Sequence, residues 1–414
     1  MVYDVVVIGG GAAGFFTAIN TKINHPNTKI LIIEKSKNLL GKVLVSGGGR
    51  CNVTHACFVP EELIKYYPRG HKELLSVFNR FSPNDTINWF KERGIELKKE
   101  LDGRMFPVSD SSETIANCFL NEVSKLKVEI KINCSINQIE NKNNEFILTS
   151  NNEVIVARKI VVASGSSDAV WQIVKNLGHK IIPPVPSLFT FNCKHPYFKD
   201  LMGVSFLKAK VKIEFTPEQL KLFKLKKSDL IQSGPLLITH WGLSGPAILK
   251  LSSVAARALF DLQYQFNIKV NFTGLNSVDE IYQGLLNMKS EQSKKMLGNI
   301  NPFGISSRFW VNLLEVENIE NKMIGDCSHK ELLKIAEKIG NADIQISGKS
   351  TNKEEFVTSG GVDLKEVDFK TMESKLIPGI YFAGEVLNID ALTGGFNFQA
   401  AWSESWIISQ SVLA

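Results

Sequence analysis

The sequence predicts an α/β fold in two parts: a domain with a parallel sheet built from both ends of the chain, and an insert between those ends. Three observations lead to this fold class. The first residues show the pattern of strand, helix and strand. Two later apolar strands, Lys159–Ala163 and Gly379–Ala383, run towards glycine as the first strand does, and the segment between them changes to alternating and then helical patterns. A domain that is interrupted by an insert accounts for all three.

The chain opens with a βαβ unit. Val2–Gly9 is an apolar run, interrupted only by Asp4 and rich in β-branched residues, which is typical of a parallel strand buried on both faces. A helix is predicted from Ala12 to about Ile23, and a second strand over Lys29–Ile33. This order places a glycine-rich turn between a parallel strand and the helix that follows it.

Gly9, Gly11 and Gly14 form a GxGxxG motif in that turn. The first glycine allows a tight turn, the second lets the backbone approach a pyrophosphate, and the third lets the helix pack closely on the strand. Glu34 follows Gly14 by 20 residues at the end of the second strand, where a carboxylate can accept hydrogen bonds from ribose hydroxyls. The motif predicts a Rossmann site for NAD or FAD, with the phosphates at the helix N-terminus.

The middle of the chain is predicted to form the insert. The stretch Pro183–Ser187 marks the exit from the first domain, and alternating residues over Lys208–Phe215 indicate antiparallel β structure. Apolar residues at helical spacing follow. The predicted ranges are 1–187 and 346–414 for the discontinuous domain and 188–345 for the insert, which is mainly β over 188–275 and mainly helical over 276–345.

The composition is that of a globular protein with a mild basic excess. Hydrophobic residues make up 44% of the 414 residues and the formal net charge is +6, which excludes disordered and fibrous classes. The lysines are spread along the sequence, so a small-molecule substrate is favoured over nucleic acid. The longest apolar stretch, Val5–Phe16, is too short for a membrane span or a secretory signal, so we expect no membrane association and a cytoplasmic protein.

A second glycine-rich loop, Ser46–Asn52, can expose backbone N–H groups to a phosphate or a flat ring, with Arg50 as a fixed positive charge. The alternative is a surface turn with a solvated arginine. Cys51 and Cys57 have five residues between them, one more than the redox pair of flavin disulfide reductases. On a helix this offset points the thiols to different faces, so we expect two unpaired thiols. The six cysteines include no CxxC pair, and no metal site is predicted.

The segment Ile377–Trp402 is the most informative part of the sequence. A buried strand delivers Gly384 and Glu385 to its C-terminal end, where the carboxylate can bond a ribityl hydroxyl. Thr393–Gly395 then opens a last helix, predicted from about Phe396 to Ser409, whose free N–H groups can face the flavin N1 and C2 carbonyl and raise the electron affinity of the ring. The alternative is a helix packed on the sheet with an ordinary glycine start.

Several of these motifs together resemble a known family. The chain is similar to the bacterial aminoacetone oxidase family of FAD-binding enzymes, a group of NAD(P)/FAD-dependent oxidoreductases that includes a dehydro-bile-acid reductase. The resemblance spans nearly the whole chain. It rests on the GxGxxG motif with Glu34 and on the segments Gly41–Thr54, Ile238–Leu249, Val357–Val362 and Thr371–Ser403.

The resemblance implies an FAD domain of the glutathione-reductase type, interrupted by an insert with a β-barrel portion and a helical portion. It implies FAD as the cofactor, with NAD(P)H as a candidate transient reductant. The residues that we expect to surround FAD are Gly9, Gly11, Ala12, Ala13, Gly14, Glu34, Lys35, Lys42, Ser46, Gly47, Gly48, Gly49, Arg50, Cys51, Asn52, Ile136, Ser164, Gly165, Gly384, Glu385, Gly394, Gly395, Phe396, Asn397 and Phe398.

One loop departs from the family pattern. After Gly165, such proteins resemble one another in a longer loop with proline, threonine and several glycines, whereas here Ser166–Asp168 leads directly into a helix. Substrate or nicotinamide contacts made by that loop elsewhere are therefore in doubt for this chain.

The sequence identifies no definite catalytic residue, and the candidates are His240, Arg50 and Asn397. His240 can act as an acid or base, or can equally fix a turn. Arg104 can meet an anionic substrate, although a surface hairpin is the commoner explanation for its segment.

These observations predict an FAD-dependent oxidoreductase that transfers a hydride between flavin N5 and a small organic substrate, with reduction of an activated double bond as one form of this reaction. The alternatives are an amine oxidase that uses oxygen, a flavoprotein that acts on RNA, and a flavin-binding regulator without turnover. A single GxGxxG motif is present, so NAD(P)H is expected to bind without a Rossmann domain of its own, near Arg50, His240 and Asn397. The oligomeric state is left open.

Overall fold

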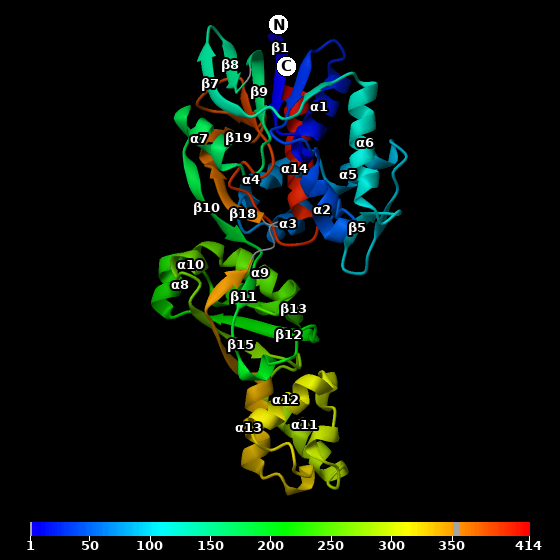
Figure 1. Ribbon diagram of the computed structural model, residues 1–414, viewed down its shortest axis with the longest axis vertical. Helices are drawn as coiled ribbons and strands as arrows, with labels where there is room; N and C mark the ends of the chain where they lie inside the picture. Colours follow the sequence, from blue (N-terminus) through cyan, green and yellow to red (C-terminus); the bar gives the residue numbers. More distant parts are fainter. Residues whose placement is uncertain (1, 152, 351–356) are drawn as a thin grey trace. The chain divides into compact units, whose positions relative to one another are not determined.

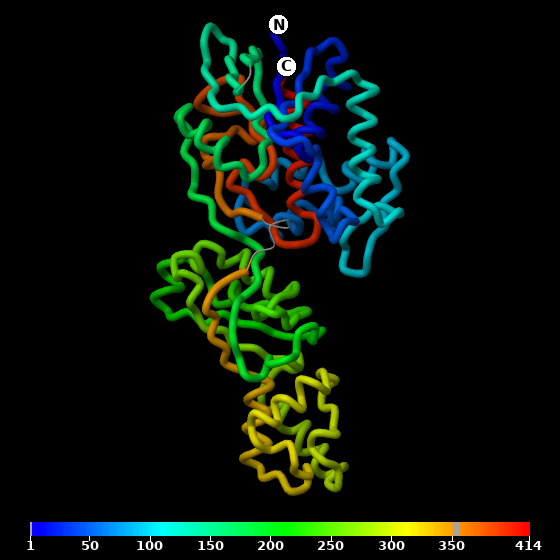
Figure 2. The backbone as a smooth tube through the Cα atoms, viewed as in Figure 1, coloured from blue at the N-terminus to red at the C-terminus, as the bar shows by residue number. Residues whose placement is uncertain are grey.

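The computed structural model describes residues 2–151, 153–350 and 357–414. These residues form two compact units, whose elements are labelled in Figure 1. The terminal unit comprises Met1–Val185 and Lys353–Ala414, and the insert unit comprises Pro186–Asn352. Figure 2 shows both ends of the chain, blue and red, within the terminal unit. Each unit has a hydrophobic core of its own.

The main sheet of the terminal unit has the strand order β19-β20-β21-β9-β1-β2-β6. From β21 to β6 the neighbouring strands pair in parallel, and the central residues Val5, Val6 and Val7 are fully buried. Because parallel strands end at the same edge of a sheet, the residues that follow β1, β2, β9 and β21 lie along one edge. The strands are β1 (Val2–Ile8), β2 (Ile30–Ile33), β6 (Glu129–Lys131), β9 (Val154–Val162), β19 (Val367–Asp368), β20 (Glu373–Ser374) and β21 (Ile380–Phe382).

Two helices from opposite ends of the sequence pack together beside this sheet. Helices α1 (Ala12–Asn24) and α14 (Phe396–Ser411) lie side by side in Figure 1, and the Ser405 hydroxyl donates to the Ala13 carbonyl at 3.0 Å. The Phe16 ring of α1 lies 5.3 Å from the Trp402 ring of α14, measured between centroids. The C-terminal helix is therefore part of the core around the first βαβ unit.

Smaller elements complete the terminal unit. A small antiparallel sheet has the order β3-β5-β4. The β7–β8 hairpin pairs through β8 with the first residues of β9, and β10 pairs with β18 where the chain leaves and re-enters the unit. Its other strands are β3 (Thr54–His55), β4 (Leu97–Lys99), β5 (Arg104–Pro107), β7 (Ile136–Lys142), β8 (Glu145–Ser150), β10 (Ile181–Ser187) and β18 (Val357–Val362). Its other helices include α2 (Gly41–Gly49), α3 (Pro60–Leu63), α4 (His71–Phe78), α5 (Pro83–Lys91), α6 (Ser112–Lys125) and α7 (Asp168–Asn176).

The insert unit contains an antiparallel sheet with the order β16-β15-β12-β13-β14-β11-β17. Only Ser347 separates β16 from β17, although these strands stand at opposite ends of that order. One continuous passage of chain therefore borders both edges, and the sheet must curl round on itself in the manner of a barrel. The strands are β11 (Thr190–Asn192), β12 (Ser205–Glu214), β13 (Ile231–Ile238), β14 (Gly242–Ser244), β15 (Phe266–Asn271), β16 (Ala342–Ile346) and β17 (Gly348–Ser350).

Helices of the insert unit fall into two groups. Three helices lie between β12 and β15 in the sequence: α8 (Pro217–Phe223), α9 (Pro246–Val254) and α10 (Ala256–Asp261). Three more lie between β15 and β16: α11 (Val278–Glu291), α12 (Ser307–Val316) and α13 (His329–Gly340). The segment 188–275 thus contains helices as well as strands. The chain returns to the terminal unit later than the predicted residue 346, because β16 and β17 pair with β15 and β11 of the insert. These pairings are long-range, and the alternating pattern of residues 342–350 does not show which strands they pair with.

Among the described residues, no helix combines the length and the apolar character needed to cross a bilayer. The same part of the chain contains no group of three or more histidine, cysteine, aspartate or glutamate side chains placed to hold a metal ion.

Candidate FAD-binding site

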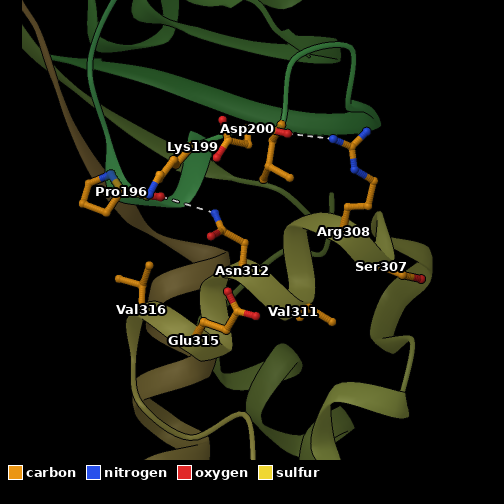
Figure 3. A pocket seen from close by; sticks show the side chains of 10 residues that line it. Pro196, Lys199, Asp200, Ser307, Arg308, Val311, Asn312, Glu315 and Val316 are labelled. Carbon is orange, nitrogen blue, oxygen red and sulfur yellow. Dashed lines mark hydrogen bonds between the residues drawn. The ribbon is translucent and has the colours of Figure 1, made fainter.

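A groove of about 790 Å³ lies within the insert unit, between the segment that starts at Pro196 and helix α12. Figure 3 shows its polar groups turned to the neighbouring backbone: Arg308 donates to the Asp200 carbonyl at 2.7 Å, and Asn312 to the Pro196 carbonyl at 3.3 Å. Its charges balance, with Lys199 and Arg308 against Asp200 and Glu315. The groove carries no preference for an anion, and it contains none of the residues that the sequence predicts around FAD.

The glycines of the first loop differ in what surrounds them. A Cβ on Gly9 would lie 2.3 Å from the Ala163 carbonyl oxygen, and a Cβ on Gly14 would lie 2.0 Å from the Gly9 carbonyl oxygen. A Cβ on Gly11 would meet no atom within 4 Å. Gly9 and Gly14 are therefore fixed by close backbone packing, and Gly11 faces open space in which a phosphate group fits.

The N-terminus of α1 is suited to an anion. Gly11 precedes the helix in an extended conformation, no side chain caps the helix, and its first turn contains no acidic residue. The first N–H groups have no partner within a helix, and the helix dipole favours negative charge at that end. Ala12 and Ala13 in this turn leave the N–H groups uncovered by long side chains.

Glu34 is held at the end of β2 by two backbone amides. Its Oε2 accepts from Gly10 N at 2.8 Å and its Oε1 accepts from Ser36 N at 2.9 Å. Each carboxylate oxygen keeps a further lone pair, so the group can still accept from ribose hydroxyls. The predicted neighbours Lys35, which is exposed, and Ile136, which is buried at the start of β7, lie near this strand end through the bond from Cys134 N to the Glu34 carbonyl at 3.0 Å.

The second glycine loop is the broken end of α2. The helical dihedral angles stop at Ser46, and Gly47, Gly48 and Gly49 have φ of 59°, 68° and 81°. A Cβ on Gly48 or Gly49 would meet no atom within 4 Å, and both residues are exposed. Three consecutive residues in the left-handed region require glycine, and this loop presents bare backbone on an open side.

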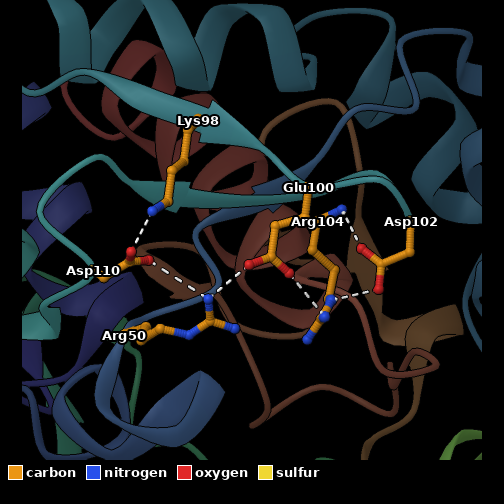
Figure 4. Close-up of polar contacts among 6 residues, drawn as sticks. All are labelled: Arg50, Lys98, Glu100, Asp102, Arg104 and Asp110. Carbon is orange, nitrogen blue, oxygen red and sulfur yellow. Dashed lines mark hydrogen bonds and ion pairs between the residues drawn. The ribbon is translucent and has the colours of Figure 1, made fainter.

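Arg50 follows this loop and belongs to a network of charged side chains (Figure 4). It donates to Glu100 at 2.6 Å, lies 3.5 Å from Asp110, and its guanidinium stands 3.9 Å from the centroid of the Phe106 ring. The hydrogen bond to Glu100 raises the pKa of Arg50 above its ordinary value. Arg104 joins the same network through Glu100 at 2.9 Å. Both arginines are thus engaged by carboxylates, and Arg50 braces the second loop against the β3-β5-β4 sheet.

The ends of β9 and β21 meet beside α1. A Cβ on Gly9 would lie 2.9 Å from Ser164 Cα, and one on Gly165 would lie 3.9 Å from a carboxylate oxygen of Glu385. Lys42 of α2 forms an ion pair with Glu385, so the second loop reaches the same edge. Helix α7 begins at Asp168, which leaves only a short connection after Gly165. The structure therefore brings these predicted residues together, although they come from four separate stretches of sequence.

Gly384 and Glu404 form a contact that the sequence analysis missed. The backbone N–H of Gly384 donates to Glu404 Oε2 at 2.6 Å, while Glu404 Oε1 has no hydrogen-bond partner within the described residues. Burial raises the pKa of Glu404 to about 8. A single charged residue in the middle of a helix that is otherwise uncharged was the available signal.

The N-terminus of α14 is braced by buried polar groups. With its amide oxygen turned towards the helix, Asn52 accepts from Gly395 N at 2.9 Å. Gln399 accepts from the hydroxyls of Thr54 at 2.5 Å and Thr86 at 2.9 Å. Asn397, a candidate catalytic residue, instead accepts from Ala391 N at 2.9 Å. The contact of Asn397 is that of a residue that positions the preceding loop.

A stack of aromatic rings stands beside this helix end. The Phe396 ring lies 4.2 Å from the Tyr66 ring and 4.5 Å from the His55 ring, nearly parallel to both. His55 and Tyr66 are partly exposed, and a Cβ on Gly394 would lie 2.6 Å from the Phe396 ring. Phe398 stacks on Trp402 at 5.5 Å and faces the core. The sequence analysis predicted Phe396 and Phe398 but missed Tyr66 and His55, which lies three residues after the second glycine loop.

The cysteines are free throughout the described part of the chain. Cys51 is buried, and this burial raises the pKa of its thiol to about 12. Burial also raises the pKa of Cys57. Both thiols are therefore protonated and unreactive at neutral pH. His240 is exposed in the turn after β13, and because it belongs to the insert unit its place beside a flavin stays a prediction.

These features fit FAD. The open positions at Gly11, Gly48 and Gly49, the uncapped start of α1 and the carboxylates Glu34 and Glu385 lie along the edge of one sheet, as an elongated dinucleotide requires. Glu34 would hold the adenosine ribose, α1 the pyrophosphate, and the start of α14 the flavin.

A family model described as the HI0933-like protein Rossmann domain matches residues 3–411. The chain belongs to this family. The HI0933-like assignment confirms the predicted resemblance, the Rossmann-type α/β fold class and an FAD-binding oxidoreductase.

Curated relatives of this HI0933-like chain cover its whole length. Ribosomal RNA dihydrouridine synthases from Escherichia coli (strain K12) and Haemophilus influenzae are each 27% identical to it, over 100% and 98% of this chain and 98% of each relative. A 3-dehydro-bile acid delta(4,6)-reductase from Clostridium scindens is 23% identical over 98% of both chains.

Proposed function

We propose that this protein reduces a carbon–carbon double bond conjugated to a carbonyl group, and that the double bond belongs to a uracil base of ribosomal RNA. The observation that carries this proposal is the full-length similarity, at 27% identity, to two ribosomal RNA dihydrouridine synthases. The dispersed lysines led us to expect a small molecule and no nucleic acid. The relatives favour RNA instead.

The two reactions named among the relatives share one chemistry. Dihydrouridine is uridine with hydrogen added across C5 and C6, a bond conjugated to the C4 carbonyl, and a 3-keto steroid with double bonds at positions 4 and 6 contains the same conjugated unit. Such a bond accepts a hydride at the carbon remote from the carbonyl and a proton at the adjacent carbon. When bound, FAD supplies the hydride, and NAD(P)H is the proposed source of the two electrons.

The residues of this chain have three tasks in that reaction. The start of α1 and Glu34 hold the dinucleotide, and the N–H groups at the start of α14 stabilise negative charge on the flavin ring. The aromatic stack of His55, Phe396 and Tyr66 offers a flat surface beside that helix end, on which a planar base can pack. His55 and Tyr66 both carry an exchangeable proton and are the proposed proton donors.

The test is a reconstituted reaction. The protein with FAD and NAD(P)H is incubated with unmodified ribosomal RNA transcribed in vitro and, separately, with assembled ribosomal subunits, and the nucleosides are analysed by mass spectrometry. We expect dihydrouridine, seen as uridine heavier by two hydrogens, and its loss in a Tyr66→Phe/His55→Gln variant that still binds FAD. Absence of dihydrouridine from every RNA substrate overturns the proposal.

A small conjugated ketone is the second candidate substrate, and the 23% identical bile acid reductase is the observation that favours it. The same reaction with a 3-keto-4-ene steroid in place of RNA distinguishes the two. Rapid loss of the enone absorbance together with unmodified RNA supports the small-molecule function. A ribosomal RNA substrate would make the cytoplasm the site of the reaction, in agreement with the predicted location.

A further inference from the structure

The positive charge of the chain is concentrated in one unit. Residues 186–352 contain 21 lysines and arginines against 15 aspartates and glutamates, so the whole formal excess of +6 lies in the insert unit. The terminal unit is balanced. The lysines are spread over both units, but only in the insert unit do basic residues outnumber acidic ones, which changes what the charge implies about a partner.

Within the insert unit, the excess is densest on β12 and α8. The segment 208–227 contains seven lysines and only two acidic residues, Glu214 and Glu218. On β12, Phe206, Ala209, Val211 and Ile213 are buried, whereas Lys208 and Lys210 are exposed and Lys212 is partly exposed. The strand thus points its apolar side into the insert core and its lysines outward, and α8 with the turn after it adds four more exposed lysines: Lys221, Lys224, Lys226 and Lys227.

Most of these lysines lack a counter-charge. Lys212 pairs with Glu214 at 2.7 Å, and Lys269 of the neighbouring β15 pairs with Asp343 at 2.6 Å. Among the described residues, the six exposed lysines form no ion pair: Lys208, Lys210, Lys221, Lys224, Lys226 and Lys227. A row of ammonium groups without carboxylates repels itself unless a polyanion binds there.

The other end of the same strand pair is apolar and exposed. Ser205 of β12 stands opposite Leu237 of β13, and Leu207 and Leu237 both point away from the core, with 77% and 37% of their surface exposed. The turn after β13 presents Trp241, which is 68% exposed. The backbone of this turn is fixed, because Trp241 N donates to Thr239 Oγ1 at 3.3 Å and the Trp241 carbonyl accepts from Cys193 N at 3.0 Å.

We propose that this surface, named the β12 face, binds single-stranded RNA of the substrate that contains the reduced base. The β12 face consists of Leu207, Lys208, Lys210, Lys221, Lys224, Lys226, Lys227 and Trp241. The proposal rests on the proposed RNA substrate. Lysines along a strand contact successive phosphates, and an exposed indole stacks on a base. A strand of ten residues is about 33 Å long, which spans several nucleotides. The combination of unpaired cations with a fixed exposed tryptophan favours RNA over a purely electrostatic partner.

The experiment compares two double variants with the same change in charge. Lys208→Gln/Lys210→Gln alters the β12 face, and Lys294→Gln/Lys295→Gln removes two exposed lysines of the helical part as a control. Binding of labelled ribosomal RNA fragments is measured by fluorescence anisotropy at several salt concentrations, after thermal unfolding and FAD content have shown that each variant is folded. A Trp241→Ala variant tests the stacking contact.

We expect the β12 face variant to bind RNA about tenfold more weakly than the control, with the slope of log Kd against log salt reduced by about 1.4, or 0.7 for each lost phosphate contact. Trp241→Ala should also weaken binding about tenfold, with an unchanged slope. Equal binding by the β12 face variant and the control overturns the proposal. Binding of the parent protein to anionic phospholipid vesicles but not to RNA, lost in the β12 face variant, overturns it in favour of a membrane.

Failure of this proposal and failure of the proposed function give different results. If dihydrouridine is formed and the β12 face variants bind and react like the control, the proposed function stands and the proposed RNA-binding surface is wrong. If RNA binding depends on salt and on the β12 face but no dihydrouridine is formed, the RNA-binding surface is supported and the proposed reaction is wrong.

Discussion

The two glycine loops of the terminal unit use the same residue for different physical reasons. In the first loop, Gly9 and Gly14 are required because backbone atoms lie within 2.3 Å of where a Cβ would be, and only Gly11 faces open space. In the second loop, Gly48 and Gly49 have open space around them and are required by their positive φ. Glycine therefore supports the fold in one loop and sets the backbone conformation in the other, and substitutions should separate these roles.

The same substitution at two positions of the first loop should give the sharpest contrast. Gly14→Val places a side chain 2.0 Å from the Gly9 carbonyl oxygen, and we expect a loss of stability on the order of 5 kcal/mol. Such a loss leaves little folded protein, and thermal unfolding with soluble yield is the measurement. A Gly14→Val variant that folds like the parent would show that strand and helix can separate without penalty.

Gly11→Val should leave the fold intact and remove FAD. No atom lies within 4 Å of the new Cβ, so the apoprotein has the stability of the apo parent, but the side chain occupies the space that the pyrophosphate needs. The flavin released by heat is identified by chromatography: FAD from the parent and none from the variant. Normal FAD content in Gly11→Val would mean that this loop has another purpose.

Gly384, which follows β21, donates its backbone N–H to a buried acid, Glu404. The pKa of Glu404 is raised to about 8 in the folded protein, whereas an unfolded glutamate titrates near 4.5. Between these values the folded protein keeps a proton that the unfolded chain has lost, so the contribution of Glu404 to stability falls as pH rises. The stability of Glu404→Gln relative to the parent should therefore increase from pH 4.5 to pH 8, by on the order of 4 kcal/mol.

Denaturant unfolding at several pH values measures this difference. The Gln side chain keeps an acceptor for Gly384 N but places a donor where Glu404 Oε1 has no described partner, so the absolute stability carries a constant offset and the pH trend is the informative quantity. Glu92→Gln, at an exposed position, is the control for replacing a glutamate with glutamine. A flat difference for Glu404→Gln would mean that its carboxyl group is ionised in the fold.

The second loop should respond weakly to a single methyl group. Gly49→Ala meets no atom within 4 Å but forces alanine to a φ of 81°, so we expect a loss of about 1 kcal/mol of stability. FAD affinity, measured by fluorescence titration, should fall less than in Gly11→Val. A loss of FAD as complete as in Gly11→Val would show that the methyl group points directly at the cofactor.

The cysteines that follow the second loop should have the smallest effect. Cys51→Ser/Cys57→Ser removes two thiols whose raised pKa values keep them protonated, so flavin reduction by NAD(P)H should proceed at the parent rate. Stopped-flow absorbance of the flavin is the measurement. Slow reduction with intact FAD binding would restore the disulfide mechanism that the five-residue spacing argues against.

Sequence reasoning succeeded where the signal is local. The helix predicted from Ala12 to about Ile23 spans Ala12–Asn24 in the structure, and the helix predicted from Phe396 to Ser409 spans Phe396–Ser411. These predictions succeed because each helix directly follows a glycine-rich turn, a signal that lies in consecutive residues. The GxGxxG motif likewise lies in the turn between β1 and α1, as predicted, and the pyrophosphate site there stays a prediction.

The features that were missed depend on residues far apart in the chain. The contacts of Arg50 with Glu100, of Gly384 with Glu404 and of Phe396 with Tyr66 are tertiary, and no spacing rule connects their members. The end of the insert failed for the same reason, since β17 is defined by its pairing with β11. The charge excess of the insert was also missed, although residues 186–352 are contiguous and their charges can be counted from the sequence.

Because α14 packs against α1, the terminal unit can finish folding only at the end of synthesis. During synthesis the first strand, β1, emerges long before β21 of the same sheet and before α14, whereas the insert is complete before β21 or α14 appears. At about 5 to 20 residues per second, the chain between residues 190 and 396 takes roughly 10 to 40 s to make. The nascent chain thus contains the complete insert while the terminal unit still lacks α14, and the flavin site proposed at the start of α14 can form only after that.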